Sequence, residues 1–114
     1  FKGIVYDSQK EVFLHNRKTI THFEENEKKV LYFLLNHIDQ FVSLNQLNEL
    51  FENPTQPETL SAIIKRREQA INGLLNKVSK LTGVAEEELL LERKNLEDKR
   101  LKDLLLLPQL LKKV

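Results

Sequence analysis

The sequence contains no cysteine and only three glycines, and both shortages exclude classes of protein. Without cysteine, neither a disulfide framework nor a thiolate metal site can form. The glycines Gly3, Gly73 and Gly83 lie too far apart to build a loop that cradles a phosphate. The longest apolar runs, Val30 to Leu35 and Leu104 to Leu107, are far shorter than a bilayer span, so we expect no membrane-spanning helix.

The length of 114 residues suits one domain with a single hydrophobic core. No signal peptide is recognisable, so we expect a cytoplasmic protein. The first residue is Phe1 rather than Met, and we therefore expect a piece of a longer protein, with any sensor or receiver module outside it.

Side chains with catalytic chemistry are present, but they form no recognisable constellation. The histidines His15, His22 and His37 lie 7 and 15 residues apart without the glutamate of an H-E-x-x-H motif, so we expect ordinary surface side chains. Glu24 and Glu25 stand at a predicted helix start, where the helix dipole explains them. No pair of nucleophile and base suggests itself, and we expect no enzyme activity, metal or other cofactor.

Short β-branched and aromatic runs predict an antiparallel sheet at the N-terminus. Gly3 to Tyr6 and Glu11 to Leu14 are separated by a four-residue turn, and a third run covers Thr19 to Thr21. We expect these three strands to form a meander with one face on the core.

Two helices should follow this sheet. The first is predicted from about Glu24 to Asn36, with Phe23 as the staple residue before it and acids in its first turns. Ser43 to Gln46 has the S-x-x-Q form of a capping box, which predicts a short second helix ending near Phe51.

The stretch from Glu58 to Leu81 has the apolar spacing of one long amphipathic helix. We expect Thr55, in the proline-containing loop before it, to cap this helix and Gly83 to end it. The apolar stripe predicted to face the core contains Leu60, Ile64, Ile71, Leu74, Leu75, Val78 and Leu81. The opposite face is expected to carry Lys65, Arg66, Gln69, Asn72, Gly73, Asn76 and Lys80.

This polar face combines amides and cations without a carboxylate beyond the first turn. A merely solvated helix normally mixes both signs of charge, whereas amides and cations are the groups that read base edges and phosphates. Between Glu58 and Leu81 five cations stand against two acids, a local excess of three positive charges in a chain of net charge +1. The pattern favours a nucleic-acid partner, and the alternative is a surface helix that happens to lack acids on one side.

Two leucine-bearing runs after this helix predict a β-hairpin with a charged tip. They cover Glu88 to Arg93 and Leu101 to Leu107. Leucine-rich runs are poor strand formers, so helix is the alternative for both. Pro108 ends the second run, and residues 109–114 are expected to be a basic tail.

The predicted order of three strands, helix, short helix, loop, long helix and hairpin is that of a winged helix with an N-terminal sheet. Phe23 to Leu34 resembles the Leu-Thr-x-x-Glu-x-x-Leu-Leu-x-x-Leu of the DNA-binding effector domain of OmpR/PhoB-type regulators, with Glu27 on its glutamate. Gln40 to Leu47 is similar to that family's Arg-Val-Val-Ser-x-x-x-Leu, and Ile71 to Val78 to its Ile-Ser-Arg-Leu-Arg-Lys-Lys-Leu. The resemblance covers about residues 3 to 107.

The sequence departs from this family at several positions. Gly73 and Leu75 stand where the family usually has arginines, and Glu24 replaces its capping threonine. The hairpin lacks the usual Arg-Gly-x-Gly-Tyr and looks more like a divergent branch with Glu-Arg-Lys-Asn and Asp-Lys-Arg at these positions. Some such proteins sit at the cytosolic end of membrane-anchored sensors, so a membrane contact is expected only through a part outside this chain.

The resemblance implies an α+β winged helix-turn-helix that binds double-stranded DNA as the output domain of a bacterial transcriptional regulator, as in two-component signalling. Its parts would be an N-terminal sheet (1–22), a three-helix core (23–83), a wing hairpin (84–107) and a tail (108–114). It also implies contact with RNA polymerase through the loop from Asn53 to Gln56, and pairing of two copies on DNA. No small-molecule substrate is implied.

In a winged helix the long helix lies in the major groove and the wing lies beside it. The expected phosphate contacts are Lys65, Arg66, Lys77 and Lys80. The expected base contacts are Gln69, Asn72 and Asn76, because an amide can bond adenine in a bidentate way. The expected wing contacts are Arg93, Lys94, Asn95, Lys99 and Arg100, unless these only form a solvated hairpin tip.

Two residues of the long helix need separate interpretations. Gly73 either lets the backbone approach the duplex closely or is a tolerated defect that costs about 1 kcal/mol relative to alanine. Arg67 falls near the apolar stripe, where we expect it to snorkel or to pair with an acid. The alternative function for the whole domain is a winged helix used for protein contact, with the polar helix face on an acidic partner or on a second copy.

Overall fold

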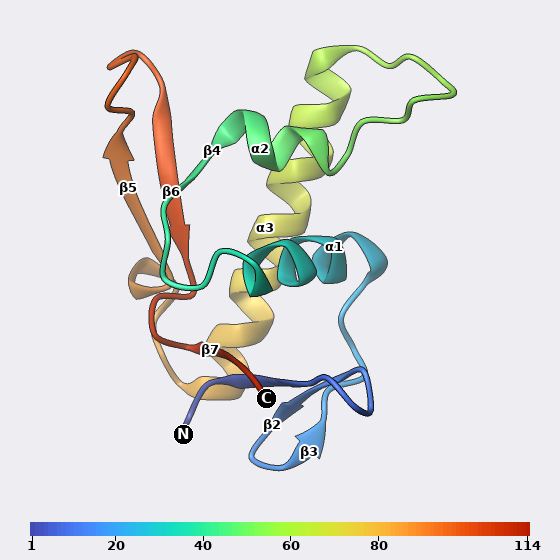
Figure 1. The fold of residues 1–114 in the computed structure, drawn as a ribbon, viewed down its shortest axis with the longest axis vertical. Helices are drawn as coiled ribbons and strands as arrows, with labels where there is room; N and C mark the ends of the chain where they lie inside the picture. Colours follow the sequence, from blue (N-terminus) through green and yellow to red (C-terminus); the bar gives the residue numbers. More distant parts are fainter.

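The computed structural model describes residues 1–114 as an α+β fold with three helices and two sheets (Figure 1). The helices are α1 (Glu25–Leu35), α2 (Leu44–Glu49) and α3 (Leu60–Thr82), followed by the short 3-10 helix η1 (Glu86–Glu88). The strands are β1 (Ile4–Asp7), β2 (Val12–His15), β3 (Lys18–Thr19), β4 (Val42–Ser43), β5 (Leu90–Lys94), β6 (Lys102–Leu106) and β7 (Leu111–Lys113). None of the helices is both long enough and apolar enough to cross a bilayer.

The first sheet has four strands in the order β3-β2-β1-β7. The predicted antiparallel meander of β1, β2 and β3 is confirmed. The segment predicted only as a basic tail contains an unpredicted strand, because β7 pairs in parallel with β1 and Leu111 lies opposite Ile4. Leu110 and Leu111 are buried, so the end of the chain contributes to the core.

The second sheet has three strands in the order β4-β6-β5. The predicted hairpin is confirmed as the antiparallel pair β5 and β6, which runs in register from Leu90 opposite Leu106 to Lys94 opposite Lys102. The third strand, β4, was not predicted; it has only two residues, and Val42 pairs with Leu104 of the hairpin. It leads directly into α2, so it ties that helix to the hairpin.

The turn between the two sheets has an unusual backbone. Leu107 and Gln109 have φ angles of 52° and 60°, in the left-handed region that residues with a side chain seldom adopt. The Gln109 N–H donates to the Asp39 carboxylate at 2.6 Å, which anchors the turn to the loop after α1. Leu107 itself is 1% exposed, and its burial holds this turn in place.

The first two helices begin as their capping residues predict. Glu24 precedes α1, and its N–H donates to the Glu27 carboxylate at 2.9 Å. Ser43 caps α2, where its hydroxyl accepts from the Gln46 N–H at 3.0 Å and the Gln46 side chain accepts from the Ser43 N–H at 2.9 Å. The capping box in the sequence is therefore confirmed.

The long helix is confirmed, but its predicted start is wrong. Thr59, not Thr55, is the N-cap, and its hydroxyl accepts from the Ala62 N–H at 3.3 Å. The Thr55 hydroxyl instead donates to the Asn53 side chain at 2.8 Å within the preceding loop. The helix ends at Gly83 with a φ of 76°, as the sequence predicts.

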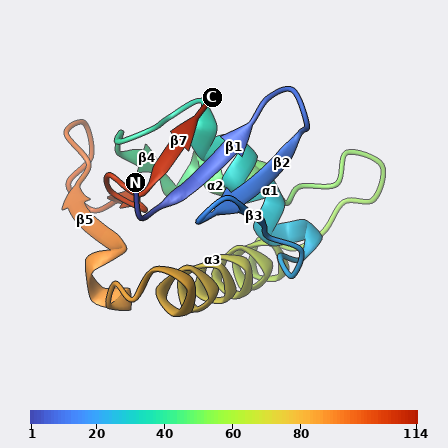
Figure 2. The same cartoon turned by 90° about the horizontal axis from the view of Figure 1, so that it is seen from below.

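The buried face of α3 lies within one hydrophobic core. Ile71, Leu74, Leu75 and Val78 are buried as expected. Leu60 is not part of the stripe, because it stands at the first turn beyond the core and is 63% exposed. Seen from below, α3 runs along one side of the molecule and the four-stranded sheet occupies another (Figure 2).

Leu74→Ala should lower the free energy of unfolding by about 2–5 kcal/mol, because Leu74 is fully buried and the deletion leaves a cavity. Urea denaturation followed by circular dichroism measures this loss. The matched control is Leu60→Ala on the same helix, which should change stability by less than about 0.5 kcal/mol. Equal losses for the two variants would contradict the assignment of Leu60 to the surface.

Candidate nucleic-acid interface

The structure places all three predicted base-contacting amides of α3 at the surface. Gln69, Asn72 and Asn76 are exposed, and so are the predicted phosphate contacts Lys65 and Lys80. Their spacing along the chain puts the five side chains on one face of the helix. We call these five residues the α3 ridge. It contains no carboxylate.

The two arginines near the start of α3 are engaged within the protein. Arg66 forms an ion pair with Glu58, just before the helix, which leaves it less free for a phosphate than predicted. Arg67 is 8% exposed and donates to the Asn48 side chain of α2 at 2.8 Å. It also lies 3.6 Å from the Glu68 carboxylate, so the expected pairing with an acid is confirmed.

Lys77 contacts α1 rather than pointing away from the protein. Its ammonium lies 2.5 Å from the Glu27 carboxylate and donates to the His22 carbonyl at 2.9 Å. Glu27 is only 4% exposed, so its charge needs this partner. The predicted phosphate contact at Lys77 is therefore replaced by an ion pair between the two helices.

Gly73 also faces Glu27, one helical turn before Lys77. A Cβ atom at this position would clash with the Glu27 carboxylate oxygen. The structure thus gives Gly73 a different role from either of the two considered: it lets α1, not a duplex, approach the α3 backbone. Residues 73 and 77 lie at the border between the buried and exposed faces of α3. From the sequence both were predicted as DNA contacts, whereas they face α1.

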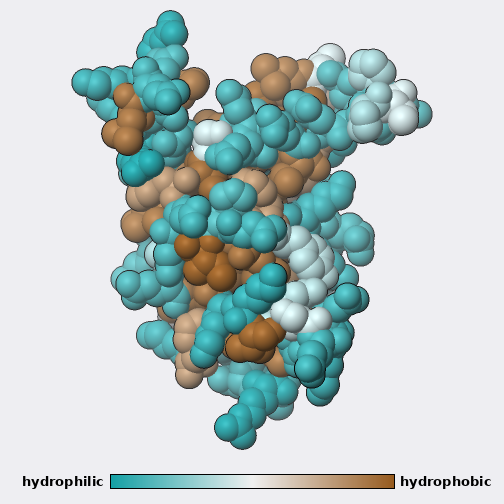
Figure 3. Space-filling view, in the orientation of Figure 1, coloured by the Kyte–Doolittle hydropathy of each residue, from teal (hydrophilic) through white to brown (hydrophobic).

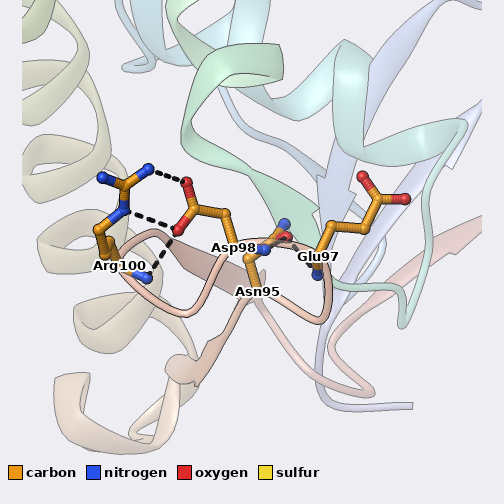
Figure 4. Close-up of polar contacts among 4 residues, drawn as sticks. All are labelled: Asn95, Glu97, Asp98 and Arg100. Carbon is orange, nitrogen blue, oxygen red and sulfur yellow. Dashed lines mark hydrogen bonds and ion pairs between the residues drawn. The ribbon is translucent and has the colours of Figure 1, made fainter.

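Three of the five predicted wing residues hold the hairpin itself. Arg93 lies 3.6 Å from the Asp103 carboxylate and 4.2 Å from the centre of the Phe41 ring. The Asn95 amide donates to Asp103 at 2.9 Å, and its carbonyl oxygen accepts from two backbone N–H groups of the tip. Arg100 forms an ion pair with Asp98, as Figure 4 shows.

The tip ion pair has an electrostatic consequence. Hydrogen bonds from the Arg100 side chain and backbone N–H lower the pKa of Asp98 below its ordinary value of 3.8. A lowered pKa means that this contact contributes fully above the ordinary pKa and is lost only as the pH falls through the lowered one. Asp98 is therefore ionised at neutral pH and can accept these hydrogen bonds.

The two remaining predicted wing cations are free, and the hairpin carries a further lysine, Lys102, that was not predicted as a contact. Lys94 and Lys99 are exposed and form no ion pair. Lys94 lies directly opposite Lys102 in the register, and like charges in that position destabilise a hairpin. Lys102 is partly compensated by Glu92 at 3.3 Å. The pairing of Lys102 with Lys94 across the hairpin places it beside a predicted wing residue, and this register could have identified it as a further wing cation.

The site is thus an acid-free ridge on α3 beside a hairpin that carries free lysines. Asn72 of the ridge lines the same hollow as Leu90 and Lys102 of the hairpin, so the two parts adjoin. Two acids, Glu68 and Glu92, also line this hollow. Amides can donate and accept hydrogen bonds, and lysines provide point charges, so the arrangement is suited to binding rather than to covalent chemistry. No group of histidine or acidic side chains could hold a metal ion.

Comparison with known proteins does not identify a relative: no protein-family model matches the sequence, and neither a curated protein nor a solved structure does. The resemblance to OmpR/PhoB-type domains therefore stays a prediction from the residues.

Gly73→Ala should destabilise the protein by up to about 2 kcal/mol, because overpacking of the contact with Glu27 costs about 1–3 kcal/mol and the better helix propensity of alanine offsets about 1 kcal/mol. Thermal unfolding measures the change. If Gly73 were exposed, the same substitution would stabilise the protein by about 1 kcal/mol, since alanine has the higher helix propensity. Stabilisation by Gly73→Ala would thus show that this flank of α3 is open.

Lys77→Ala should cost about 3–5 kcal/mol of stability, since it leaves the Glu27 carboxylate buried without its partner. Lys80→Ala, one turn further along the exposed ridge, is the control and should change stability by less than about 0.5 kcal/mol. Denaturation in urea compares the two. A loss at Lys77 no larger than that at Lys80 would refute the structural role of the ion pair.

Proposed function

We propose that this chain is a winged-helix domain that binds duplex DNA as the output domain of a bacterial transcriptional regulator. The observation that carries the proposal is the α3 ridge, where three amides and two lysines lie exposed without a carboxylate. In this arrangement α3 occupies the major groove, and the β5–β6 hairpin acts as the wing. The loop from Asn53 to Gln56 as a contact with RNA polymerase, and pairing of two copies on DNA, belong to the same proposal.

The architecture supports this use of α3. The hairpin and α3 project at the same end of the molecule, with α2 between them (Figure 1). Arg67 and Asn48 join α2 to α3, and β4 joins the start of α2 to the hairpin. These links fix the positions of all three elements before a ligand arrives, so less conformational entropy is lost on binding.

The dimensions of the ridge fit a major groove. Gln69 and Asn76 lie seven residues apart, which is about 10 Å along a helix axis. Lys65 and Lys80 stand beyond them at the two ends, about 22 Å apart. The amides would then face base edges, since Asn and Gln can bond adenine in a bidentate way, while the lysines reach the backbones on either side.

A protein partner at the same end of the molecule is the second candidate, and the exposed leucines of the hairpin favour it. Leu96 at the tip is 81% exposed, and Leu91 and Leu101 are each 46% exposed. In the space-filling view, hydrophobic side chains appear among hydrophilic ones on this hairpin, at the upper left (Figure 3). Exposed apolar side chains that gather in one region are typical of protein contacts.

Titration of a random-sequence duplex at low and moderate salt tests the proposal. The affinity should fall steeply as salt rises, and Lys65→Ala should reduce the slope of log K against log salt by about one. Arg66→Ala is the matched control at the neighbouring position, where Glu58 already neutralises the charge, and it should change the slope less. A domain that binds no duplex at any ionic strength would favour the protein partner instead.

A further inference from the structure

The free positive charge of this protein is concentrated in the segments that build and connect the four-stranded sheet rather than in α3. Residues 1–22 and 108–114 contain six cations and two acids, although the whole chain has a net charge of +1. The six cations are Lys2, Lys10, Arg17, Lys18, Lys112 and Lys113. All six are exposed and none forms an ion pair. The rest of the molecule is correspondingly acidic.

The outer face of this sheet has an apolar centre. The register places Lys112 of β7 opposite Val5 of β1, Val5 opposite Leu14 of β2, and Leu14 opposite Thr19 of β3. Directly paired residues lie on the same face of a sheet, so these four side chains form a row across it. Val5 and Leu14 are only partly buried, whereas Ile4 on the opposite face is fully buried.

Phe1 and Arg17 complete this face. Together with Val5, Leu14 and Asn16 they line a shallow hollow on the sheet. Phe1 is 64% exposed, and the Lys112 ammonium lies 5.7 Å from the centre of its ring. The outer face therefore combines an exposed aromatic ring and two aliphatic side chains with cations at both edges. Figure 2 looks towards this sheet, with α3 along a different side.

We propose that the outer face of the four-stranded sheet docks on a membrane surface that contains anionic lipids. Clusters of four to eight lysines and arginines are attracted to such surfaces, and apolar side chains among them enter the headgroup region. The register places Lys112 on this face, whereas Lys18 and Lys113 pair with His15 and Tyr6 and extend from the other face of the two edge strands. Five of the six cations around the sheet are lysines, and lysine is depleted at protein–protein interfaces, where arginine is enriched. A phosphate backbone alone offers no partner for Phe1, Val5 and Leu14. An anionic bilayer offers negative headgroups to the cations and an apolar region to the hydrophobic side chains of this face.

The docking leaves the proposed DNA contact free, because the sheet and the α3 ridge share no residue. When the sheet is bound to a membrane, the hairpin and the start of α3 project at the other end of the molecule and stay accessible to DNA (Figure 1). The two proposals can therefore fail separately, since each depends on its own set of side chains.

Sedimentation of the full chain with lipid vesicles tests the docking. The protein should bind vesicles of phosphatidylcholine and phosphatidylserine, bind vesicles of pure phosphatidylcholine weakly or not at all, and dissociate as salt rises. The double variant Arg17→Glu/Lys112→Glu should lose more than about tenfold in affinity, since two attractive charges become repulsive. Circular dichroism checks that this variant folds, as both positions are exposed.

The matched control is Lys28→Glu/Lys29→Glu, which changes the net charge equally on the surface of α1 and leaves the α3 ridge intact. It should retain vesicle binding within about threefold if the charges near the lipid dominate. Equal loss in the two double variants would show that only net charge matters and would overturn the proposal. Absence of binding to phosphatidylserine vesicles would overturn it too, as would preference for soluble polyglutamate over vesicles, which would indicate an acidic protein partner.

Discussion

The ion pair between Glu27 and Lys77 joins the first helix to the last, and the orientation of α3 depends on it. A carboxylate that is 4% exposed is costly unless it is fully paired, and here the Lys77 ammonium and the Glu24 N–H supply the partners. Gly73 leaves room for this carboxylate, because a Cβ atom at position 73 would meet its second oxygen, which takes no part in the pair. The pair thus acts together with the buried Leu74 and Val78 to hold one face of α3 inward, and the amides of the opposite face are exposed.

The elements that carry their own local signals could be predicted from the sequence. The capping box at Ser43, the acids at the start of α1 and Gly83 at the end of α3 each act on their own helix, and all three were confirmed. The strands β4 and β7 have two and three residues, which is too short for a periodicity. They exist because distant strands offer them hydrogen bonds, so the local sequence could not indicate them.

The candidate site likewise contains residues whose placement the local sequence predicted and residues whose placement depends on distant partners. Helical periodicity predicted the exposed amides correctly, because exposure follows from the face on which a residue lies. The fate of the cations depends on partners from elsewhere in the chain, such as Asp103 for Arg93, and charge counting could not foresee it. One signal was available: Glu27 is in phase with the buried Val30, Leu31 and Leu34, so a buried acid in need of a cation was indicated.

The parallel pairing of β1 with β7 joins the two ends of the chain in one sheet. During synthesis β1 has to wait for β7, because Leu111 reaches its place beside Ile4 only after all the residues between them have left the ribosome. Contacts between such distant residues slow folding. Until then one edge of β1 stays open, so the nascent domain depends on avoiding premature pairing with other strands.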